Sequence, residues 1–356
     1  MGHDLLFPMY FDEHGKMLMA DDKAIRWLSQ PLIKALFQGA KVKVKIKKEI
    51  LHQKKEAIVL NCLDNCFGHV FFKLWNASVL KKKYTDKSII VFVPSIMRWL
   101  VPDGIDEIWS FEHSFDEIEK HLVGLDDDIK QNLLPRFQKV WMSKAFTHLD
   151  LAKVDLKAML RRDRFDLTKF KAVQPQITFV LREDRFWHRH PFEFFLFKVF
   201  VKLGWSKRIF VWRQNHLINR LSALIKSRID NIRFAATGIG NRSGLLPIIE
   251  DKRKVRLTPQ DEDDWCKLYA RSHIVIGVHG SNMLIPSALS AGFIEILPRH
   301  KIRHIAEETL INYNSRYSLF LGRHVDHFAS PRLIADHAVS LIRDFPYLFI
   351  NTEQAI

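Results

Sequence analysis

The sequence predicts an α/β protein of two Rossmann-like domains that face a cleft. Short apolar runs alternate with longer segments of helical periodicity, and this alternation occurs twice along the 356 residues. Between the two series lies a charged, less regular region that ends in the proline-containing stretch 171–176, which indicates a linker. The length is also typical of two domains. We therefore expect domains at 1–170 and 171–356, each with a mostly parallel sheet.

Composition limits the class of protein. Hydrophobic residues make up 47% of the chain, which is enough for buried cores, and without a run of about 18 apolar residues we expect no transmembrane helix. The N-terminus lacks a basic region followed by an apolar core, and the three cysteines form no disulfide framework, so we expect a cytoplasmic protein. The net charge of +15 favours phosphate-rich partners, which are nucleic acid, anionic lipid headgroups or nucleotide-linked substrates.

The first half begins with an extension that has helical spacing at 25–37 and becomes basic from residue 41. Residues 41–47 alternate lysine with apolar residues, which predicts a strand with a lysine face. Such a strand is either a solvated sheet edge, where lysines block edge pairing, or a contact surface for a membrane. Ser114 and Glu117 have the spacing of a capping box. The other expected elements are strands at 57–60, 88–93 and 107–111 and a helix at 68–84.

The second half repeats this rhythm. Thr258, Pro259 and Asp261 predict a helix start with Thr258 as its N-cap, and Ser330 and Pro331 predict the start of the last helix. We expect strands at 177–181, 208–212 and 232–236, and helices at 191–203, 217–229 and 331–345.

Residues 273–297 predict a strand, a tight turn, a short helix and a second strand. His279 and Gly280 end the first strand, and Ser281 or Asn282 is expected to cap the helix. A strand that leads through a glycine turn into a helix N-terminus presents N–H donors and the positive end of the helix dipole, which suits a phosphate. An ordinary βαβ unit with a tight turn has the same pattern, so both interpretations stand.

This turn also carries a family resemblance. The residues Val-Ile-Gly-Val-His-Gly-Ser-Asn-Met-Leu at 275–284 resemble the VGVHGAGLTN segment of glycosyltransferase family sixty-one, the group of plant xylosyltransferases and of the N-acetylglucosaminyltransferase that acts on EGF domains. Residues 258–298 match best, and Arg182 and Arg185 are similar to the paired arginines that the family places upstream. The resemblance implies a GT-B fold whose second domain binds a nucleotide-diphosphate sugar and whose first domain binds the acceptor.

Three segments of the second half should reach the carboxyl edge of its sheet, where open α/β sheets bind ligands. They are Arg182 and Arg185 after one strand, the glycine-rich loop around Gly240, and the turn at 279–282. Arginine binds a diphosphate through two parallel hydrogen bonds. The resemblance adds Glu295 to the donor-binding set. The competing interpretation of the two arginines is a solvated turn with local ion pairs, which are worth little.

No metal or other cofactor is expected, because the arginines and a helix N-terminus would neutralise the diphosphate. The acidic triplets 126–128 and 261–263 contain a D-x-D pattern, but each lies at an expected helix start, where capping is the simpler role. An inverting transferase also needs a base for the acceptor hydroxyl. Asp64 and His69, after the strand at 57–60, are the candidates. Alternatively, Asp64 caps a helix and His69 binds a backbone carbonyl.

The sequence therefore predicts an inverting, metal-independent hexosyl- or pentosyltransferase. It would move a sugar from a nucleotide-diphosphate sugar to a glycan or a lipid-linked polysaccharide precursor, with peripheral contact to the inner face of an anionic membrane. Two other functions stay open: a non-enzymatic protein that binds nucleic acid or anionic membranes, and a fucosyltransferase that uses GDP-fucose. The absence of a recognised nucleic-acid motif argues against specific nucleic-acid binding.

Overall fold

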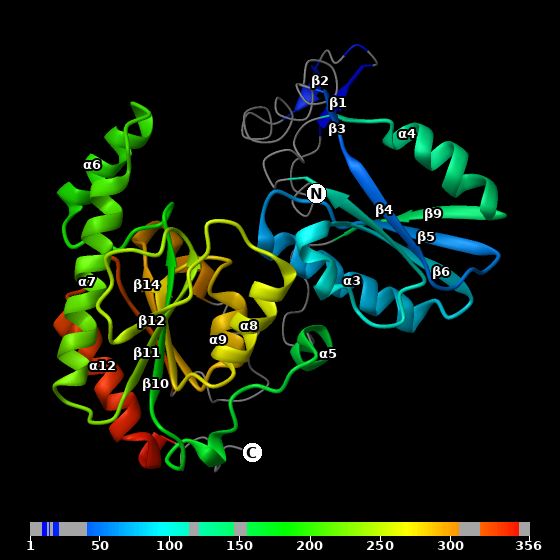
Figure 1. The fold of residues 1–356 in the computed structure, drawn as a ribbon. Helices are drawn as coiled ribbons and strands as arrows, with labels where there is room; N and C mark the ends of the chain where they lie inside the picture. The colour runs from blue at the N-terminus through cyan, green and yellow to red at the C-terminus, as the bar shows by residue number, and fades with distance from the viewer. Residues whose placement is uncertain are drawn as a thin grey trace. The chain divides into compact units, whose positions relative to one another are not determined.

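The structure is a computed structural model that describes residues 9–12, 14, 17–20, 41–113, 121–145, 155–305 and 321–348. The chain divides into two compact units (Figure 1), one of Met1–Asp150 with Ala158–Leu160 and the other of Leu151–Lys157 with Arg161–Ile356. Residue 170, near which the sequence places the break, lies inside the second unit. The helical segment expected at 25–37 and the capping pair Ser114 and Glu117 lie outside the described residues.

The first unit contains a five-stranded mixed sheet in the order β4-β7-β6-β5-β9. Strands β5, β6, β7 and β9 are parallel to one another, and β4 pairs antiparallel with β7 at one edge. The predicted single strand at 41–47 is divided into two, because residues 41–43 belong to a separate two-stranded sheet, whereas β4 lies at a sheet edge as the sheet-edge interpretation predicts. The bounds are β4 (Lys45–Ile50), β7 (Glu107–Glu112), β6 (Lys87–Pro94), β5 (Glu56–Asn61) and β9 (Lys139–Ser143).

Helix α3 (Phe67–Lys83) connects β5 to β6 and buries Val70, Phe71 and Leu74. Its last turn carries three lysines, which suit the negative end of the helix dipole. The smaller elements of this unit are β1 (Met9–Phe11), β2 (Met17–Ala20), β3 (Lys41–Lys43), β8 (His121–Val123) and α4 (Leu125–Asp128). A short helix, α5 (Leu156–Leu160), lies at the division between the units in the chain.

The second unit contains a six-stranded parallel sheet in the order β12-β11-β10-β13-β14-β15. Its inner strands are buried on both faces, as continuous apolar runs predict. The strands are β10 (Gln176–Arg182), β11 (Arg233–Ile239), β12 (Ile249–Asp251), β13 (Ile274–Val278), β14 (Gly292–Leu297) and β15 (Gly322–Asp326).

Helices cover both faces of this sheet, with α7 (Arg208–Lys226) and α12 (Pro331–Arg343) on one face and α8 (Pro259–Tyr269) and α9 (Leu284–Leu289) on the other (Figure 1). Helix α6 (Pro191–Lys202) precedes α7. The predicted starts of α8 and α12 are confirmed: Thr258 and Asp261 form a capping box, and the Ser330 hydroxyl accepts a hydrogen bond from the Leu333 amide.

Each sheet has a point where the strand order reverses. In the first unit the chain passes from β5 through β6 to β7, and β9 then pairs with the other side of β5. In the second unit the chain passes from β10 through β11 to β12, and β13 returns to the other side of β10. In doubly wound folds the crevice beyond the carboxyl ends of such strands binds the ligand. The segments after β5, β10 and β13 are therefore the first places to search for sites.

Two local predictions are wrong. Residues 208–212 are not a strand but the first turns of α7, because Phe210, Gln214, Leu217 and Leu221 are buried at helical spacing. The apolar run at 209–212 is too short for its periodicity to distinguish a strand from a helix. Ser281 and Asn282 do not cap α9, which begins later, after Met283, and lacks a side-chain cap.

Candidate active site

Arg185 connects the segment after β10 with the turn after β13. Its Nη1 donates a hydrogen bond to the carbonyl oxygen of His279 at 3.2 Å. Gly280 has a φ of +152°, and a Cβ at this position would overlap the Arg185 guanidinium, with Cζ only 2.6 Å away. The backbone conformation of the turn favours glycine, and a side chain at this position would have to displace the end of the Arg185 side chain. The result is a fixed cation at the point where the strand order reverses.

Arg182 has a different environment from Arg185. Its guanidinium binds the carboxylate of Asp184 through two hydrogen bonds, Nε to Oδ1 at 2.7 Å and Nη2 to Oδ2 at 2.6 Å. Both side chains are partly exposed. The contacts of Arg182 fit the interpretation as a solvated turn with local ion pairs. Arg185, in contrast, reaches the backbone that follows the neighbouring strand β13.

Glu183 ties the same turn to the glycine-rich loop. Its Oε1 accepts a hydrogen bond from the amide of Asn241 at 2.8 Å. A Cβ on Gly240 would lie 2.8 Å from the same oxygen, so glycine permits the close approach. The three segments expected at this edge are thus brought together. Sequence reasoning missed Glu183, and its only signal is its position between two arginines at a strand end.

The rest of the loop is held by the helix beneath it. Asn215 Nδ2 donates to the carbonyl of Ser243 at 2.8 Å, and Asn219 Nδ2 donates to that of Gly244 at 2.9 Å. The buried Arg253 also donates to the Ser243 carbonyl, at 2.9 Å. Asn215 and Asn219 of α7 and Arg253, which follows β12, therefore hold the loop against the helix.

His279 and Glu295 form a buried pair. Imidazole Nδ1 lies 2.9 Å from Glu295 Oε2, and the two residues are 5% and 0% exposed. The register places Glu295 opposite Gly277 on the neighbouring strand, so the histidine two residues further on meets it from the strand end. Such a carboxylate fixes the orientation and tautomer of the imidazole. Because Glu295 is fully buried, its part in a site acts through His279.

Ser281 and Asn282 belong to the turn and not to the helix. Met283 N donates to Gly280 O at 2.7 Å, and Asn282 Nδ2 approaches Val278 O at 3.4 Å. The helix that follows, α9, has only six residues. A helix this short contributes little dipole, so the guanidinium of Arg185 is the stronger source of positive charge here.

In the first unit, Asp64 lies between His69 and Lys73 in the segment after β5. Its Oδ1 is 3.0 Å from His69 Nδ1, and its Oδ2 is 2.7 Å from Lys73 Nζ. Lys73 is buried and also donates to the carbonyl of Leu63. Burial acts to raise the pKa of Asp64, but the hydrogen bonds and charges of His69 and Lys73 outweigh it and hold the pKa at about 2.

This geometry separates the roles of Asp64 and His69. With a pKa of about 2, Asp64 is ionised at neutral pH and is a weak base. The ionised carboxylate can accept a hydrogen bond from the Nδ1–H of His69, and in that tautomer the lone pair of the imidazole is on Nε2. The His69 side chain is 38% exposed. The N-cap of α3 is Cys66 and not Asp64, and His69 Nδ1 contacts the Asp64 carboxylate.

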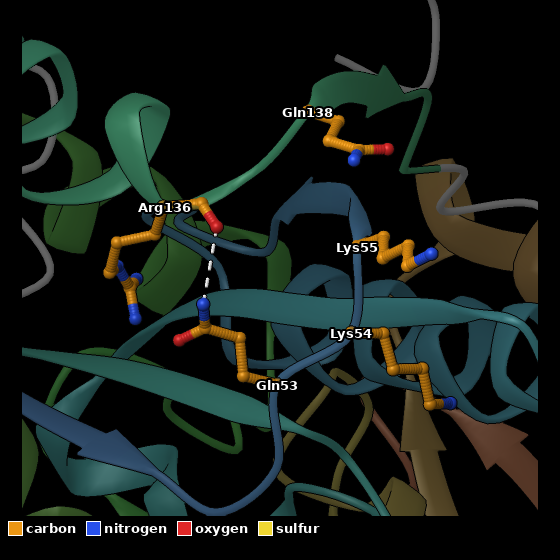
Figure 2. A pocket seen from close by; sticks show the side chains of 5 residues that line it. All are labelled: Gln53, Lys54, Lys55, Arg136 and Gln138. Atoms are coloured by element: carbon orange, nitrogen blue, oxygen red, sulfur yellow. Dashed lines mark hydrogen bonds between the residues drawn. The ribbon is translucent and has the colours of Figure 1, made fainter.

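An open hollow of about 420 Å³ lies at the other edge of the same sheet (Figure 2). Its lining residues precede β5 and β9, at the amino ends of the strands, and include Lys54, Lys55 and Arg136. Gln53 Nε2 donates to the carbonyl of Arg136 at 3.1 Å, and Lys54 Nζ donates to that of Thr85 at 2.7 Å. The polar groups of the hollow make structural contacts on the side of the sheet away from Asp64, so we assign no site to it.

Three carboxylates of the two acidic triplets bind cations. Asp128 binds Lys48, and Asp261 binds Lys254 in addition to its role in the capping box. Asp263 binds both Arg162 and Lys267 at 2.6 Å. Across the described ranges, no group of three or more histidine, cysteine, aspartate or glutamate residues is arranged to hold a metal ion. In the same part of the chain, no helix is both long and apolar enough to cross a membrane.

Comparison with known proteins gives little sequence similarity. No model of a protein family matches the chain, and no curated protein matches it. Among solved structures, the chain is similar to the spinosyn forosaminyltransferase SpnP, with a TM-score of 0.39 and 9% sequence identity. The match covers 82% of this chain and 92% of that one. At this level of similarity, a functional assignment must rest on the residues of the chain itself.

Proposed function

We propose that the protein is a glycosyltransferase of the two-domain GT-B type, similar to family sixty-one. The second unit would bind a nucleotide-diphosphate sugar, and the first would bind a glycan or a lipid-linked polysaccharide precursor. The observation that carries the proposal is the guanidinium of Arg185, seated on the Gly280 turn where the strand order of a parallel sheet reverses. Parallel sheets with helices on both faces bind nucleotides at that position, and an arginine guanidinium can bind a diphosphate through two parallel hydrogen bonds.

The proposed reaction is a single inverting displacement. His69 Nε2 accepts the proton of the acceptor hydroxyl while the hydroxyl oxygen attacks the anomeric carbon. The bond from that carbon to the diphosphate oxygen breaks, and the nucleoside diphosphate leaves with the electron pair. Arg185 stabilises the negative charge that develops on the diphosphate. Asp64 orients His69 and stabilises its imidazolium form, as a carboxylate does for a catalytic histidine.

The donor site is tested first by a thermal-shift panel of UDP-, GDP-, CMP- and dTDP-sugars. We expect one class to raise the melting temperature, because a ligand that binds the folded state stabilises it. A response to GDP-fucose alone would favour the fucosyltransferase alternative. For the responding nucleotide sugar, Arg185→Ala should weaken binding by roughly 10- to 100-fold, the value of one hydrogen bond to a charged group. Arg182→Ala is the matched control and should change it little. If no nucleotide sugar binds, the proposal is wrong.

The base is tested by turnover at saturating donor. His69→Ala should lower turnover by roughly two to four orders of magnitude while donor affinity is unchanged. Asp64→Asn should lower it by less, because the imidazole stays in place but loses its ionised partner. His52→Ala, at an exposed histidine of the same unit, is the control and should leave turnover unchanged. Equal turnover in the His69→Ala and wild-type proteins would exclude His69 as the base.

A further inference from the structure

Helix α6, its connection and the first turns of α7 expose an unusual number of large apolar side chains. Within α6 no residue is buried. Phe192 and Phe195 are 60% and 59% exposed, and Trp205 and Trp212 are 55% and 64% exposed. A concentration of exposed apolar residues of this size marks an interaction surface. We call it the aromatic hairpin surface, and it consists of Phe192, Phe195, Leu203, Trp205, Ile209 and Trp212.

Apart from Trp205, whose ring contacts Phe200 at 5.1 Å, these side chains do not form the ring contacts that hold the hairpin together. Phe210 of α7 packs against Phe197 and Phe200 of α6, with ring centroids 5.3 Å apart in each case. Phe186 packs against Phe197 at the same distance. The hairpin thus has an inner aromatic cluster that fixes its fold and a second set of apolar side chains that point to solvent.

Positive charge accompanies the exposed rings. Residues 191–213 contain five basic residues and a single acidic one, Glu193, which binds Arg213 at 3.1 Å. Lys198 and Lys202 follow Phe195 at helical spacing, and Lys207 and Arg208 stand between Trp205 and Ile209 in the sequence. Lys198 also lies over the ring of Phe194, at 4.3 Å. Exposed tryptophan and phenylalanine mixed with lysine is the composition of segments that bind the interface of an anionic bilayer.

The alternating lysines at 41–47, the other segment considered for membrane contact, fit this role less well. Lys45 pairs with Glu112 at 3.5 Å, and Lys47 pairs with Glu49 at 3.8 Å. Lys48 binds Asp128. Acidic neighbours therefore offset the charge of this strand, whereas the hairpin combines unbalanced charge with apolar rings.

We propose that the aromatic hairpin surface docks the protein on anionic lipid bilayers. The rings would enter the boundary between headgroups and acyl chains, while Lys198, Lys202, Lys207 and Arg208 contact anionic headgroups. The bases of a single-stranded nucleic acid could stack on the rings, but the exposed aliphatic side chains of Leu203 and Ile209 offer no stacking face, so the lipid surface is the better partner. This inference does not depend on the proposed glycosyltransferase activity.

The experiment is co-sedimentation with vesicles, in the absence of any nucleotide sugar. Phosphatidylcholine vesicles with about 30% phosphatidylserine should bind the protein, and pure phosphatidylcholine vesicles should bind it much more weakly. The double variant Phe195→Ser, Trp212→Ser should bind at least tenfold more weakly, as the loss of two interfacial rings requires. Tyr347→Ser removes an exposed ring elsewhere in the same unit and should bind like the wild type.

Charge variants test the electrostatic part. Lys202→Gln should weaken binding roughly fivefold, the value of one lysine near an anionic surface. Lys226→Gln, at the other end of α7, is the matched control and should have little effect. None of the changed side chains is buried, so we expect all variants to fold. Melting temperatures equal to that of the wild type would verify this.

Three results would overturn the proposal. The first is the absence of binding to the phosphatidylserine vesicles. The second is binding that the Phe195→Ser, Trp212→Ser variant retains in full. The third is a dimer in analytical ultracentrifugation that this variant abolishes without vesicles, because a second copy of the chain would then cover the surface.

Discussion

Replacing Gly280 by alanine tests the contact between the two strand ends of the second unit. The new Cβ would occupy the space of the Arg185 guanidinium, so the hydrogen bond to the His279 carbonyl would be lost. That loss costs about 1.5–3 kcal/mol for a charged donor. Alanine in the backbone conformation of Gly280 costs roughly 1–3 kcal/mol more. Gly280→Ala should therefore destabilise the second unit by about 2.5–6 kcal/mol.

A double-mutant cycle separates these two contributions. Arg185→Ala alone removes the hydrogen bond and vacates the space beside Gly280. In that background Gly280→Ala should cost only the backbone strain, so the two changes together should cost about 1.5–3 kcal/mol less than the sum of the single effects. A residue pair without contact would give additive effects.

The measurement is calorimetric unfolding of the wild type, both single variants and the double variant. For a domain of this size, 1 kcal/mol corresponds to a shift in melting temperature of about 2–4 °C, so Gly280→Ala should lower it by roughly 10 °C. If the double variant melts as the sum of the single variants predicts, Arg185 does not occupy the turn, and the donor site loses its central cation.

Metal dependence and two effects of pH are further tests. Donor binding, measured by calorimetry, should persist in excess EDTA; a loss that manganese restores would implicate the acidic triplets at 126–128 or 261–263. Burial, together with Asp261, raises the pKa of Glu262 from 4.5 to about 7, so the folded state loses stability as the pH rises through this range. Glu262→Gln should therefore raise the melting temperature more at a pH of about 8 than at about 4.5. An equal effect at both pH values would show that ionisation of the buried Glu262 carboxyl does not cause the loss of stability. Burial and the adjacent His327 lower the pKa of His188 from 6.5 to about 4, so stability is lost as the pH falls through this range. His188→Phe should flatten that part of the acid-unfolding profile, and an unchanged profile would refute the role of His188.

Local patterns in the sequence predicted most of the elements. Buried apolar runs identified the parallel strands, and Thr258 with Asp261 identified the start of α8, because these signals depend on neighbours in the chain. The prediction of a strand at 208–212 was wrong because the burial of Phe210 and Gln214 on one face stabilises a helix there. The exposed rings of α6 were also beyond sequence reasoning, since an aromatic helix is ordinarily a buried one.

The contacts of the candidate site were harder to predict than its residues. Asp64 and His69 were named together, but the buried Lys73, nine positions from Asp64, was not. The pairing of His279 with Glu295 depends on strand register, and the different environments of Arg182 and Arg185 depend on which side chain reaches the next strand. Such facts follow from long-range geometry, which neither periodicity nor a short motif contains.

Helix α7 has a mechanical consequence for the second unit. Its 19 residues make a rod of about 28 Å, with Trp212 facing solvent near its start and its later turns packed on α12. One and two turns after Trp212, Asn215 and Asn219 hold the carbonyls of the loop that follows Gly240. A force applied to the exposed end would therefore act on that loop through a stiff lever. Because one helix carries both the exposed Trp212 and these two asparagines, a displacement of its N-terminal end would also displace the Ser243 and Gly244 carbonyls.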